Sequence, residues 1–321
     1  MDLAQTTGDV LGALALMARG AVHGEGACGC GPETVRILAD REDGAVVRHG
    51  GLVAKAHAPG TEDAPHAARL ALAGRPELDG ILLPPVPGPR PGPVAGRPVT
   101  LWPYGPPVDP GDPDTAPWEE AARLLARLHR TPPPADLALP AMRAPAKAAL
   151  AVERMLRTAP GHPAAATVLA AWRTVTDAGS GSGGEGGGTR AYLCHGDFHL
   201  GQLVRDFRGA WRLIDVDDAG LGDPAWDLAR PAAWFAAGLL PAEVWARFLG
   251  AYEEEGGPAT GADPWARLDL PARALTVQTA ALALAKSTAE GRAVDEVEAV
   301  MIDTCARITL SRTAPAPAAS S

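Results

Sequence analysis

Residues 192–233 read YLCHGDFHLGQLVRDFRGAWRLIDVDDAGLGDPAWDLARPAA and contain most of the features that decide the fold. An apolar, strand-like piece leads into the tripeptide HGD at 195–197, and Gln202 follows five residues after the aspartate of that tripeptide. A second apolar strand ends at Asp215, and GDPAWDLA at 222–229 then begins a helix. Acidic and amide side chains therefore follow short strands, in loops of the kind that often carry function.

This stretch holds groups that phosphoryl transfer requires. The transition state of that reaction is loose, so a protein mainly positions the reactants and neutralises charge. Asp197 can lie near an attacking hydroxyl, while Gln202 and Asp215 offer the oxygen ligands that Mg²⁺ prefers. Lys55, inside the apolar run LVAKAHA, supplies a cation for nucleotide phosphates.

The first third of the chain predicts an antiparallel sheet. Between residues 34 and 58, runs rich in Val, Ile and Leu are interrupted by Asp-Gly and Gly-Gly dipeptides, which are hairpin signals between three short strands. A helix is expected at His66–Ala73, a Pro-rich surface loop at Pro84–Pro98 and a returning strand at Arg97–Trp102.

The rest of the chain predicts helices. The segment WEEAARLLARLHR at Trp118–Arg130 repeats its leucines at a period near 3.6 and has acidic residues at its start. Further helices are expected at Ala144–Arg157, His162–Thr176, Pro241–Glu255, Trp265–Ala289 and Val294–Leu310. Strands followed by helices indicate a two-lobed α+β fold rather than an alternating parallel α/β fold.

Domain boundaries follow from these elements. An N-terminal lobe should span residues 1–105, and a helical C-terminal lobe should span residues 106–312. The tract GSGSGGEGGG at Gly179–Gly188 predicts a flexible linker on the surface. The tail at 313–321 is rich in Ala, Pro and Ser and is expected to be disordered.

Composition and charge exclude several classes of protein. The chain has 321 residues and is 46% hydrophobic, which suffices for two lobes, and its net charge of −9 argues against a nucleic-acid partner. The first twenty residues predict an amphipathic helix rather than a signal peptide, and no stretch predicts a membrane span. Four cysteines in a chain of this length predict no disulfide framework, so a reduced cytoplasmic protein is expected.

The catalytic run resembles that of aminoglycoside phosphotransferases and their relatives, which include choline, fructosamine and macrolide kinases and maltokinases. The similarity lies in HGD at 195–197, Gln202, the strand end at 214–215 and GDPAWDLA at 222–229, in that order. One such motif would be weak evidence, whereas several in the right order are strong evidence.

Three upstream segments extend the resemblance. VAK at Val53–Lys55 is similar to the strand of the nucleotide lysine, VTLWPYG at Val99–Gly105 to the hinge that holds adenine, and LARLHR at Leu125–Arg130 to the helix after it. The resemblance covers residues 34–248. It implies a bilobal protein-kinase-like fold with a small antiparallel-sheet N-lobe and a mainly helical C-lobe.

The resemblance also implies the roles of individual residues. Asp197 would be the catalytic base, Asp215 the main Mg²⁺ ligand and Gln202 the second metal ligand. Lys55 would hold the α- and β-phosphates of ATP, or of GTP. The acceptor would be a hydroxyl of a small molecule.

Other matched residues would support the nucleotide and the loop. The backbone from Trp102 to Tyr104 would meet the adenine edge, with the N–H of Tyr104 as donor because the proline between them has none. Gly44 would belong to the turn near the phosphates. His195 and Asp227 would be braces that order the catalytic loop.

The chain departs from the usual family pattern at two places. Gln202 stands where most members have Asn; maltokinases resemble this chain there, and His199 belongs to the same HGDxHLGQ pattern. Kinase-like folds usually pair the nucleotide lysine with a Glu on the following helix, but His66–Ala73 contains none. Glu62 is the nearest candidate for that acid, and Asp217 is a further supporting residue.

A metallohydrolase is an alternative reading of the same run. His195, Asp197 and His199 alternate, so on a strand they would share one face and bind a metal with Asp215 or Asp217. The glycine at position 196 and the later motifs fit a kinase loop better.

A second metal pattern lies near the N-terminus. Cys28 and Cys30 are separated by one glycine and follow His23, which is part of a metal-ligand spacing. Without a clear second pair of ligands, a plain loop is expected.

Two further functions stay open on the residues alone. A catalytically weak pseudokinase that binds nucleotide and regulates a partner protein would fit Gln202 and the missing helix glutamate. A kinase-fold enzyme that transfers AMP would fit the same run.

The acceptor is open among aminoglycoside-like antibiotics, sugars and related metabolites. Asp217, Asp218 and Glu253–Glu255 are either attractants for a cationic acceptor or ordinary solvated faces. The sequence indicates no oligomeric state.

Overall fold

The structure of the chain is a computed structural model that describes residues 3–24, 29–31, 34–181 and 191–311. The chain forms two compact units. Unit 1 comprises residues 1–117, 134–140 and 200–217, and unit 2 comprises residues 118–133, 141–199 and 218–321. Residues 200–217 of the catalytic run thus join unit 1, although the expected boundary at residue 105 would assign them to the helical lobe. The predicted tail, and residues 182–188 of the predicted linker, lie outside the described residues.

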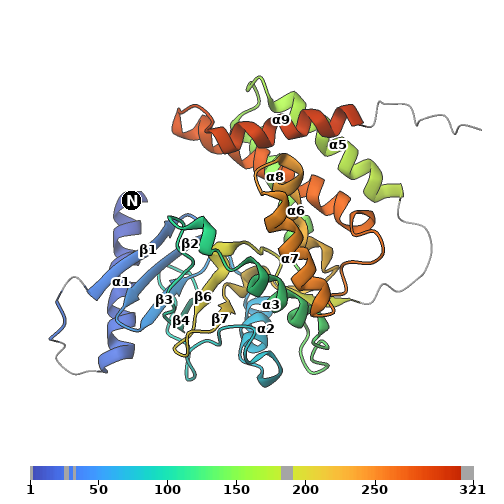
Figure 1. The fold of residues 1–321 in the computed structure, drawn as a ribbon. Coiled ribbons are helices and arrows are strands. Elements are labelled where there is room, and N and C mark those ends of the chain that lie inside the picture. Colours follow the sequence, from blue (N-terminus) through green and yellow to red (C-terminus); the bar gives the residue numbers. More distant parts are fainter. Residues whose placement is uncertain (1–2, 25–28, 32–33, 182–190, 312–321) are drawn as a thin grey trace, which may run out of the picture. The chain divides into compact units, whose positions relative to one another are not determined.

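Unit 1 contains a four-stranded antiparallel sheet in the order β1-β2-β3-β4 (Figure 1). The strands are β1 (Val35–Arg41), β2 (Gly44–His49), β3 (Leu52–Ala56) and β4 (Val99–Pro103). The predicted strands of this region are therefore confirmed. Buried and less buried residues alternate along β2, as expected for a strand with one face in the core.

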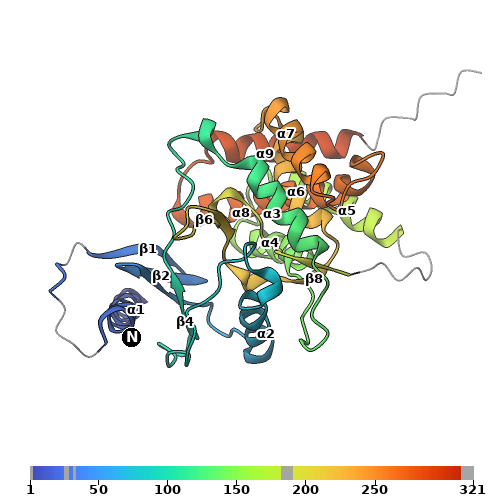
Figure 2. The same ribbon diagram turned by 60° about the horizontal axis from the view of Figure 1, so that its bottom comes forward.

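Helix α1 (Leu3–His23) packs on this sheet and confirms the predicted amphipathic helix (Figure 2). Its buried residues Val10, Leu14 and Ala18 are four positions apart and lie on one face. They form a core cluster with buried residues of the strands, including Val47 and Ala54. The helix thereby covers the apolar face that the sheet would otherwise expose.

The remaining elements of unit 1 are a helix, short 3-10 turns and the part of the catalytic run at residues 200–217. Helix α2 (Asp63–Ala73) begins three residues before the predicted helix start, and the 3-10 turn η2 (Pro76–Leu78) follows it. Strands β6 (Leu203–Arg205) and β7 (Trp211–Leu213) form an antiparallel hairpin. Each of these two strands has only three residues. Further 3-10 turns are η3 (Pro113–Thr115), η4 (Leu200–Gln202) and, into unit 2, η5 (Val216–Asp218).

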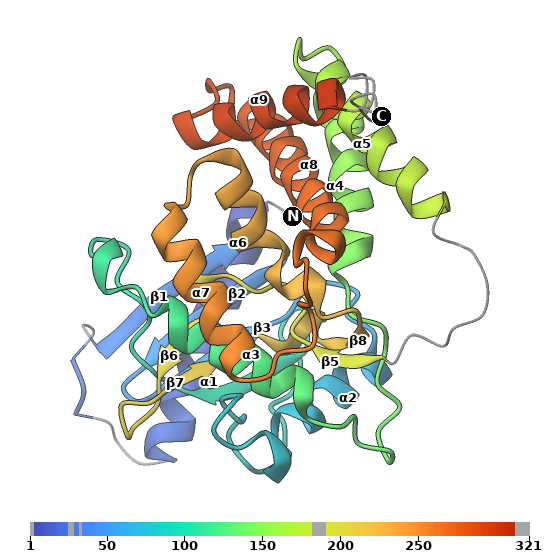
Figure 3. The ribbon, with the colours of Figure 1, turned by 45° about the vertical axis from the view of Figure 1, so that its right-hand side comes forward.

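Unit 2 is mainly helical (Figure 3). Its helices are α3 (Trp118–Arg130), α4 (Ala144–Thr158), α5 (Ala165–Gly181), α6 (Ala225–Ala237), α7 (Ala242–Glu254), α8 (Trp265–Glu290) and α9 (Glu296–Ser311). The long helix α8 packs against α4, α5, α6 and α9. Helix α5 continues to Gly181, so the start of the predicted linker is helical.

A short pair of strands completes unit 2. Strand β5 (Tyr192–Cys194) pairs with β8 (Gly220–Gly222), which the sequence reading did not predict. An antiparallel sheet in one unit and helices in the other confirm the α+β class. Within the described residues, no helix combines the length and apolarity of a membrane span.

Candidate active site

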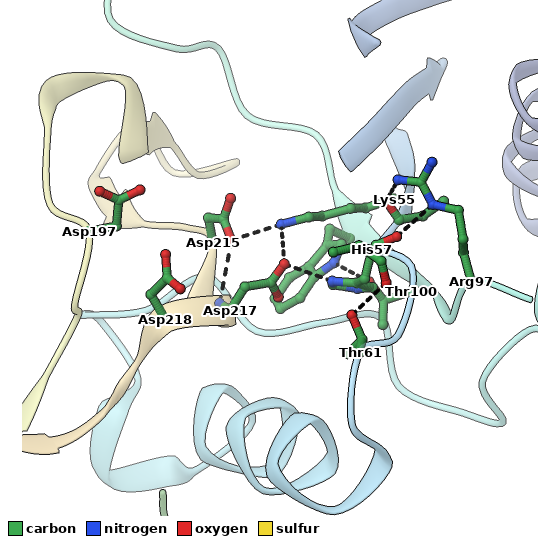
Figure 4. Close-up of polar contacts among 12 residues, drawn as sticks. Lys55, His57, Thr61, Arg97, Thr100, Asp197, Asp215, Asp217 and Asp218 are labelled. Atoms are coloured by element: carbon green, nitrogen blue, oxygen red, sulfur yellow. Dashed lines mark hydrogen bonds and ion pairs between the residues drawn. The ribbon is translucent and has the colours of Figure 1, made fainter. Parts of the chain in front are cut away.

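Lys55 lies between two carboxylates in unit 1 (Figure 4). Its Nζ atom is 2.7 Å from Oδ1 of Asp215 and 2.9 Å from Oδ2 of Asp217. The lysine is the penultimate residue of β3, and both aspartates follow the end of β7. The predicted nucleotide lysine and the predicted metal aspartate therefore belong to one ionic cluster.

The electrostatics of this cluster favour the charged forms of its members. Burial alone would lower the pKa of Lys55, but the carboxylates of Asp215 and Asp217 outweigh it and raise that pKa. Burial likewise would raise the pKa of Asp217, but hydrogen bonding to His57 and the charge of Lys55 hold that pKa far below its usual range. At neutral pH, Lys55 is therefore a cation and Asp217 an anion.

His57 forms a hydrogen bond with Asp217, and sequence reasoning missed this histidine. Nδ1–H of His57 donates to Oδ2 of Asp217 across 2.8 Å. Nε2 of the same ring lies 2.7 Å from the hydroxyl of Thr100, whose oxygen accepts the Nε1–H of Trp102 at 2.8 Å. This chain of hydrogen bonds fixes the orientation of Asp217 with buried groups of β4.

Two further basic residues surround His57. Arg97 donates from Nε to the carbonyl of His57 at 2.6 Å, which holds the backbone after β3. The buried ring of His66 lies edge-on to His57, with centroids 4.2 Å apart. Burial, with a contribution from His57, lowers the pKa of His66 to about 4, so this ring adds no charge near pH 7.

Of the two alternatives left open for Lys55, the structure has the one in which the lysine pairs with acids other than Glu62. Glu62 is exposed and forms the N-cap of α2, whereas Lys55 bonds to Asp215 and Asp217. Because Asp217 lies two residues after Asp215, a single loop delivers both partners, and the helix needs no glutamate.

The two expected metal ligands come from one end of the β6–β7 hairpin. Leu203 pairs with Leu213, and one step further the carbonyl of Gln202 accepts the N–H of Ile214 at 2.9 Å. Gln202 therefore lies opposite the residue that precedes Asp215. Asp215 has φ of 64°, a left-handed conformation that Asp tolerates better than most residues and that often marks a functional position.

The chemistry of these donors fits a magnesium ion. A carboxylate and a side-chain amide both offer hard oxygen ligands. Oδ1 of Asp215 is bonded to Lys55, and Oδ2 has no hydrogen-bond partner among the described residues. Asp215 and Gln202 would hold the ion.

The backbone N–H of Tyr104, the expected adenine donor, is bonded within unit 1, and its contact with a nucleotide stays a prediction. The N–H of Tyr104 donates to the carbonyl of Gly51 at 2.8 Å, and its ring lies under the guanidinium of Arg48, 3.4 Å from the centroid. Trp102 is buried in the core. Gly44 begins β2 opposite Arg41, and a Cβ there would meet no other atom within 4 Å, so this glycine is not required by packing.

In unit 2, Asp227 is the brace of the HGD loop, as predicted. Its carboxylate is fully buried and accepts hydrogen bonds from the backbone N–H groups of His195, at 2.6 Å, and Gly196, at 2.7 Å. Nε2 of His129 lies 2.9 Å from the same carboxylate. Burial alone would raise the pKa of Asp227, but His129 and His195 hold it below its usual value. The carboxylate therefore fixes the loop that presents Asp197.

The glycine of the HGD loop is required by its conformation and its surroundings. Gly196 has φ of 82°, and a Cβ added there would lie 2.1 Å from the carbonyl oxygen of Asp218. Residues 195–199 form no strand. His195, Asp197 and His199 therefore do not share one face of a strand, as the metallohydrolase alternative required. They lie in an irregular segment instead.

Asp197 is held by two cations that sequence reasoning missed. Nζ of Lys147 lies 2.8 Å from its Oδ2, and Nη2 of Arg230 lies 2.9 Å from its Oδ1. Burial would raise the pKa of Asp197, but Lys147 and Arg230 outweigh it and lower that pKa. Lys147 also binds Asp218 at 2.6 Å.

A pocket in unit 2 opens on Asp197. Its lining residues include Ala144, Lys147, Gly196, Asp197, Phe198, Trp226, Arg230, Leu275 and Gln278. Oε1 of Gln278 is buried and has no hydrogen-bond partner among the described residues. The pocket therefore combines two aromatic side chains, two cations, a carboxylate and an amide oxygen.

Comparisons with known proteins concern the family and the fold of the chain. The family model described as "Phosphotransferase enzyme family" matches residues 32–270. No curated protein sequence is significantly similar to the chain. Among solved structures, the amicoumacin kinase hAmiN in complex with AMP-PNP, Ca²⁺ and Ami has a TM-score of 0.64 at 15% identity, covering 93% of both chains.

Two other solved structures share the fold. A thermostable mutant of aminoglycoside phosphotransferase APH(4)-Ia, in ternary complex with AMP-PNP and hygromycin B, has a TM-score of 0.59 at 13% identity, covering 93% of this chain and 99% of that chain. A choline/ethanolamine kinase family protein from Mesorhizobium loti has a TM-score of 0.58 at 17% identity, covering 97% of this chain and 96% of that chain. These likenesses confirm the protein-kinase-like fold.

Proposed function

Because the chain belongs to the phosphotransferase enzyme family, we propose that it transfers the γ-phosphoryl group of Mg²⁺-bound ATP to a hydroxyl of a small molecule. The observation that most strongly supports this proposal is the ionic cluster of Lys55 with Asp215 and Asp217. It pairs a buried cation with a carboxylate that is suited to a magnesium ion. The AMP-PNP complexes of two solved relatives of this fold support ATP as the donor.

Unit 1 would bind the nucleotide. Lys55 would exchange part of its contact with the aspartates for the α- and β-phosphates, and Asp217 would keep its ammonium in place. Asp215 and Gln202 would hold the magnesium ion, which neutralises charge on the phosphates. GTP would offer the same phosphates to these residues.

Asp197 of unit 2 would act on the acceptor. The acceptor oxygen forms a bond to the γ-phosphorus while the bond from that phosphorus to the β-γ bridging oxygen breaks and ADP leaves. The hydroxyl proton passes to Asp197. Because Lys147 and Arg230 lower the pKa of this carboxylate, it is a weak base, which orients the hydroxyl and accepts the proton late, as a loose transition state allows.

The charges of the pocket favour a neutral or anionic acceptor, such as a sugar, over a polycationic antibiotic. Lys147 and Arg230 both line the pocket beside Asp197. In the pocket, the carboxylate of Asp197 is already paired with Lys147 and Arg230, and Lys147 also pairs with Asp218. A second ammonium group there would therefore meet like charge beside carboxylates that already have cationic partners.

The test is ADP release with Mg²⁺ and ATP across a panel of neutral sugars, sugar acids, aminoglycosides and macrolides, with the mass of each product. Neutral or anionic hydroxyl compounds should stimulate release and gain one phosphoryl group. Stimulation by aminoglycosides alone would contradict the acceptor class. A product that gains AMP, or nucleotide binding without any turnover, would contradict the kinase proposal.

A further inference from the structure

Three side chains of types that bind metal ions lie close together in unit 1, and none of them belongs to the proposed kinase site. His23 is the last residue of α1, Cys30 lies in the connection to β1, and His49 is the last residue of β2. Nε2 of His23 is 3.1 Å from Nε2 of His49 and 3.3 Å from Sγ of Cys30. One ligand atom from each residue lies within 4.8 Å of the other two.

These separations match the edges of a tetrahedral metal site. Zinc binds imidazole nitrogen at about 2.0–2.1 Å and thiolate sulfur at about 2.3 Å, so neighbouring ligand atoms on a tetrahedron are about 3.3–3.6 Å apart. The two observed separations are within a few tenths of an ångström of that range. The sequence pattern of His23, Cys28 and Cys30 lacked a second pair of ligands and predicted a plain loop. Cys28 lies outside the described residues, and the fold brings His49 to His23 and Cys30.

Ordinary hydrogen bonding explains this arrangement less well. Nε2 of His23 faces both the ring nitrogen of His49 and the sulfur of Cys30, yet a ring nitrogen carries either one proton or one lone pair. A single lone pair would have to accept two donors, or a single proton would have to serve two acceptors. A cation at the centre would use all three lone pairs.

The surroundings of His49 favour the form that binds metal. The ring is buried, and Nδ1 has no hydrogen-bond partner among the described residues. Burial of the ring disfavours the charged form of this imidazole. Neutral imidazole is the ligand form, and the exposed position of Cys30 gives a metal a path to the sulfur.

We propose that His23, Cys30 and His49 form a zinc site that joins the end of α1 to β2. Two imidazoles and one thiolate are the donor set that Zn²⁺ prefers, and the fourth tetrahedral position is left for water or another donor. The role is structural. The metal would anchor the C-terminal end of the helix, whose body is held on the sheet by apolar contacts of Val10 and Leu14.

The experiment uses the full-length protein without an affinity tag, because histidine tags bind zinc. Metal content is measured by elemental analysis, and zinc affinity by competition with a chromophoric chelator. Cobalt replaces zinc in a parallel sample to reveal sulfur coordination by its thiolate charge-transfer band. Cys30→Ala removes the exposed ligand, and His23→Ala removes a second one. Gly29→Ala is the matched control, since a Cβ there meets no atom within 4 Å and no positive φ opposes it.

Wild type and Gly29→Ala should bind one zinc ion per chain, and zinc should raise their thermal midpoints. Cys30→Ala should lose the cobalt charge-transfer band. Cys30→Ala and His23→Ala should each lower the zinc affinity by at least about 10- to 100-fold. Mutation of a residue that only hydrogen-bonds to a metal ligand already lowers metal affinity by that factor. Nucleotide binding should be the same in all four proteins. Absence of zinc binding by the wild type, or equal binding by Cys30→Ala, would overturn the proposal.

Discussion

Oδ2 of Asp217 lies 2.9 Å from Nζ of Lys55, and the same oxygen accepts the Nδ1–H of the buried His57. Protein kinases orient the corresponding lysine with a glutamate on a helix. Here the partner comes from the loop after β7, two residues beyond Asp215. One loop therefore supplies both the expected metal ligand and the group that orients the lysine.

Asp217→Asn tests this assignment. The variant keeps the shape of the side chain but loses the charge that holds Lys55. A hydrogen bond to a charged group contributes about 1.5–3 kcal/mol, and about 1.4 kcal/mol corresponds to a tenfold change, so the KM for ATP should rise by about 10- to 100-fold. Steady-state kinetics with varied ATP measures it.

Glu62→Gln is the matched control for that experiment. This acid is exposed at the start of α2, and Lys55 bonds to Asp215 and Asp217 instead. Its KM for ATP should equal that of the wild type. A large rise with Glu62→Gln and none with Asp217→Asn would show that the helix acid orients the lysine.

Lys147→Gln should make turnover more sensitive to acid. Lys147 and Arg230 lower the pKa of Asp197, so removing the lysine raises that pKa. A carboxylate with a raised pKa becomes protonated at a higher pH, and the protonated form cannot accept the acceptor's proton. The acid limb of kcat against pH should therefore move to higher pH.

Arg143→Gln is the control for this pH profile. Arg143 is half exposed and lies 3.5 Å from Asp218, so it shares an acidic partner with Lys147 but does not contact Asp197. Its acid limb should remain at the wild-type position. An unchanged profile for Lys147→Gln would contradict the role of this lysine at Asp197.

Asp227→Asn should destabilise unit 2. The buried carboxylate accepts two backbone N–H groups and pairs with His129, and an amide NH₂ would face donors instead. Breaking a buried pair costs about 3–5 kcal/mol, so a loss of about 3 kcal/mol in the free energy of unfolding is expected near pH 7. Urea denaturation measures it.

The pH dependence of this loss has a definite sign. The pKa of Asp227 is lower in the folded protein than its unfolded value of about 3.9. Its contribution is therefore fully present above the unfolded pKa and is lost as the pH falls through the folded pKa. The gap between wild type and Asp227→Asn should narrow in acid, and a gap that widened there would contradict the assignment.

Strong local patterns made much of the fold predictable. Trp118–Arg130 has a clear helical period, and its predicted bounds equal those of α3. The hairpin dipeptides located β1, β2 and β3. Strands β6 and β8 have three residues each, which is too short for alternation to appear, so only their pairing, of β6 with β7 and of β8 with β5, defines them.

The site was predictable only where one segment carries the signal. Lys55, Asp197 and Asp215 stand in motifs that the resemblance identified. His57 and Lys147 were missed because they meet their partners from distant segments of the chain. Arg230 lies in the same run as Asp197, but 33 residues separate the two and only the fold brings them together. The maltokinase likeness of the loop, and the role of Gln202 as a ligand, stay predictions.

The most direct test of the central claim compares wild type with Asp197→Asn, using ATP, Mg²⁺ and the best acceptor. The account predicts that the variant binds the nucleotide as tightly as the wild type in a calorimetric titration, while kcat falls by about 10²–10⁴-fold, the range for loss of a general base. Turnover at the wild-type rate would contradict the assignment of Asp197 as the group that accepts the hydroxyl proton.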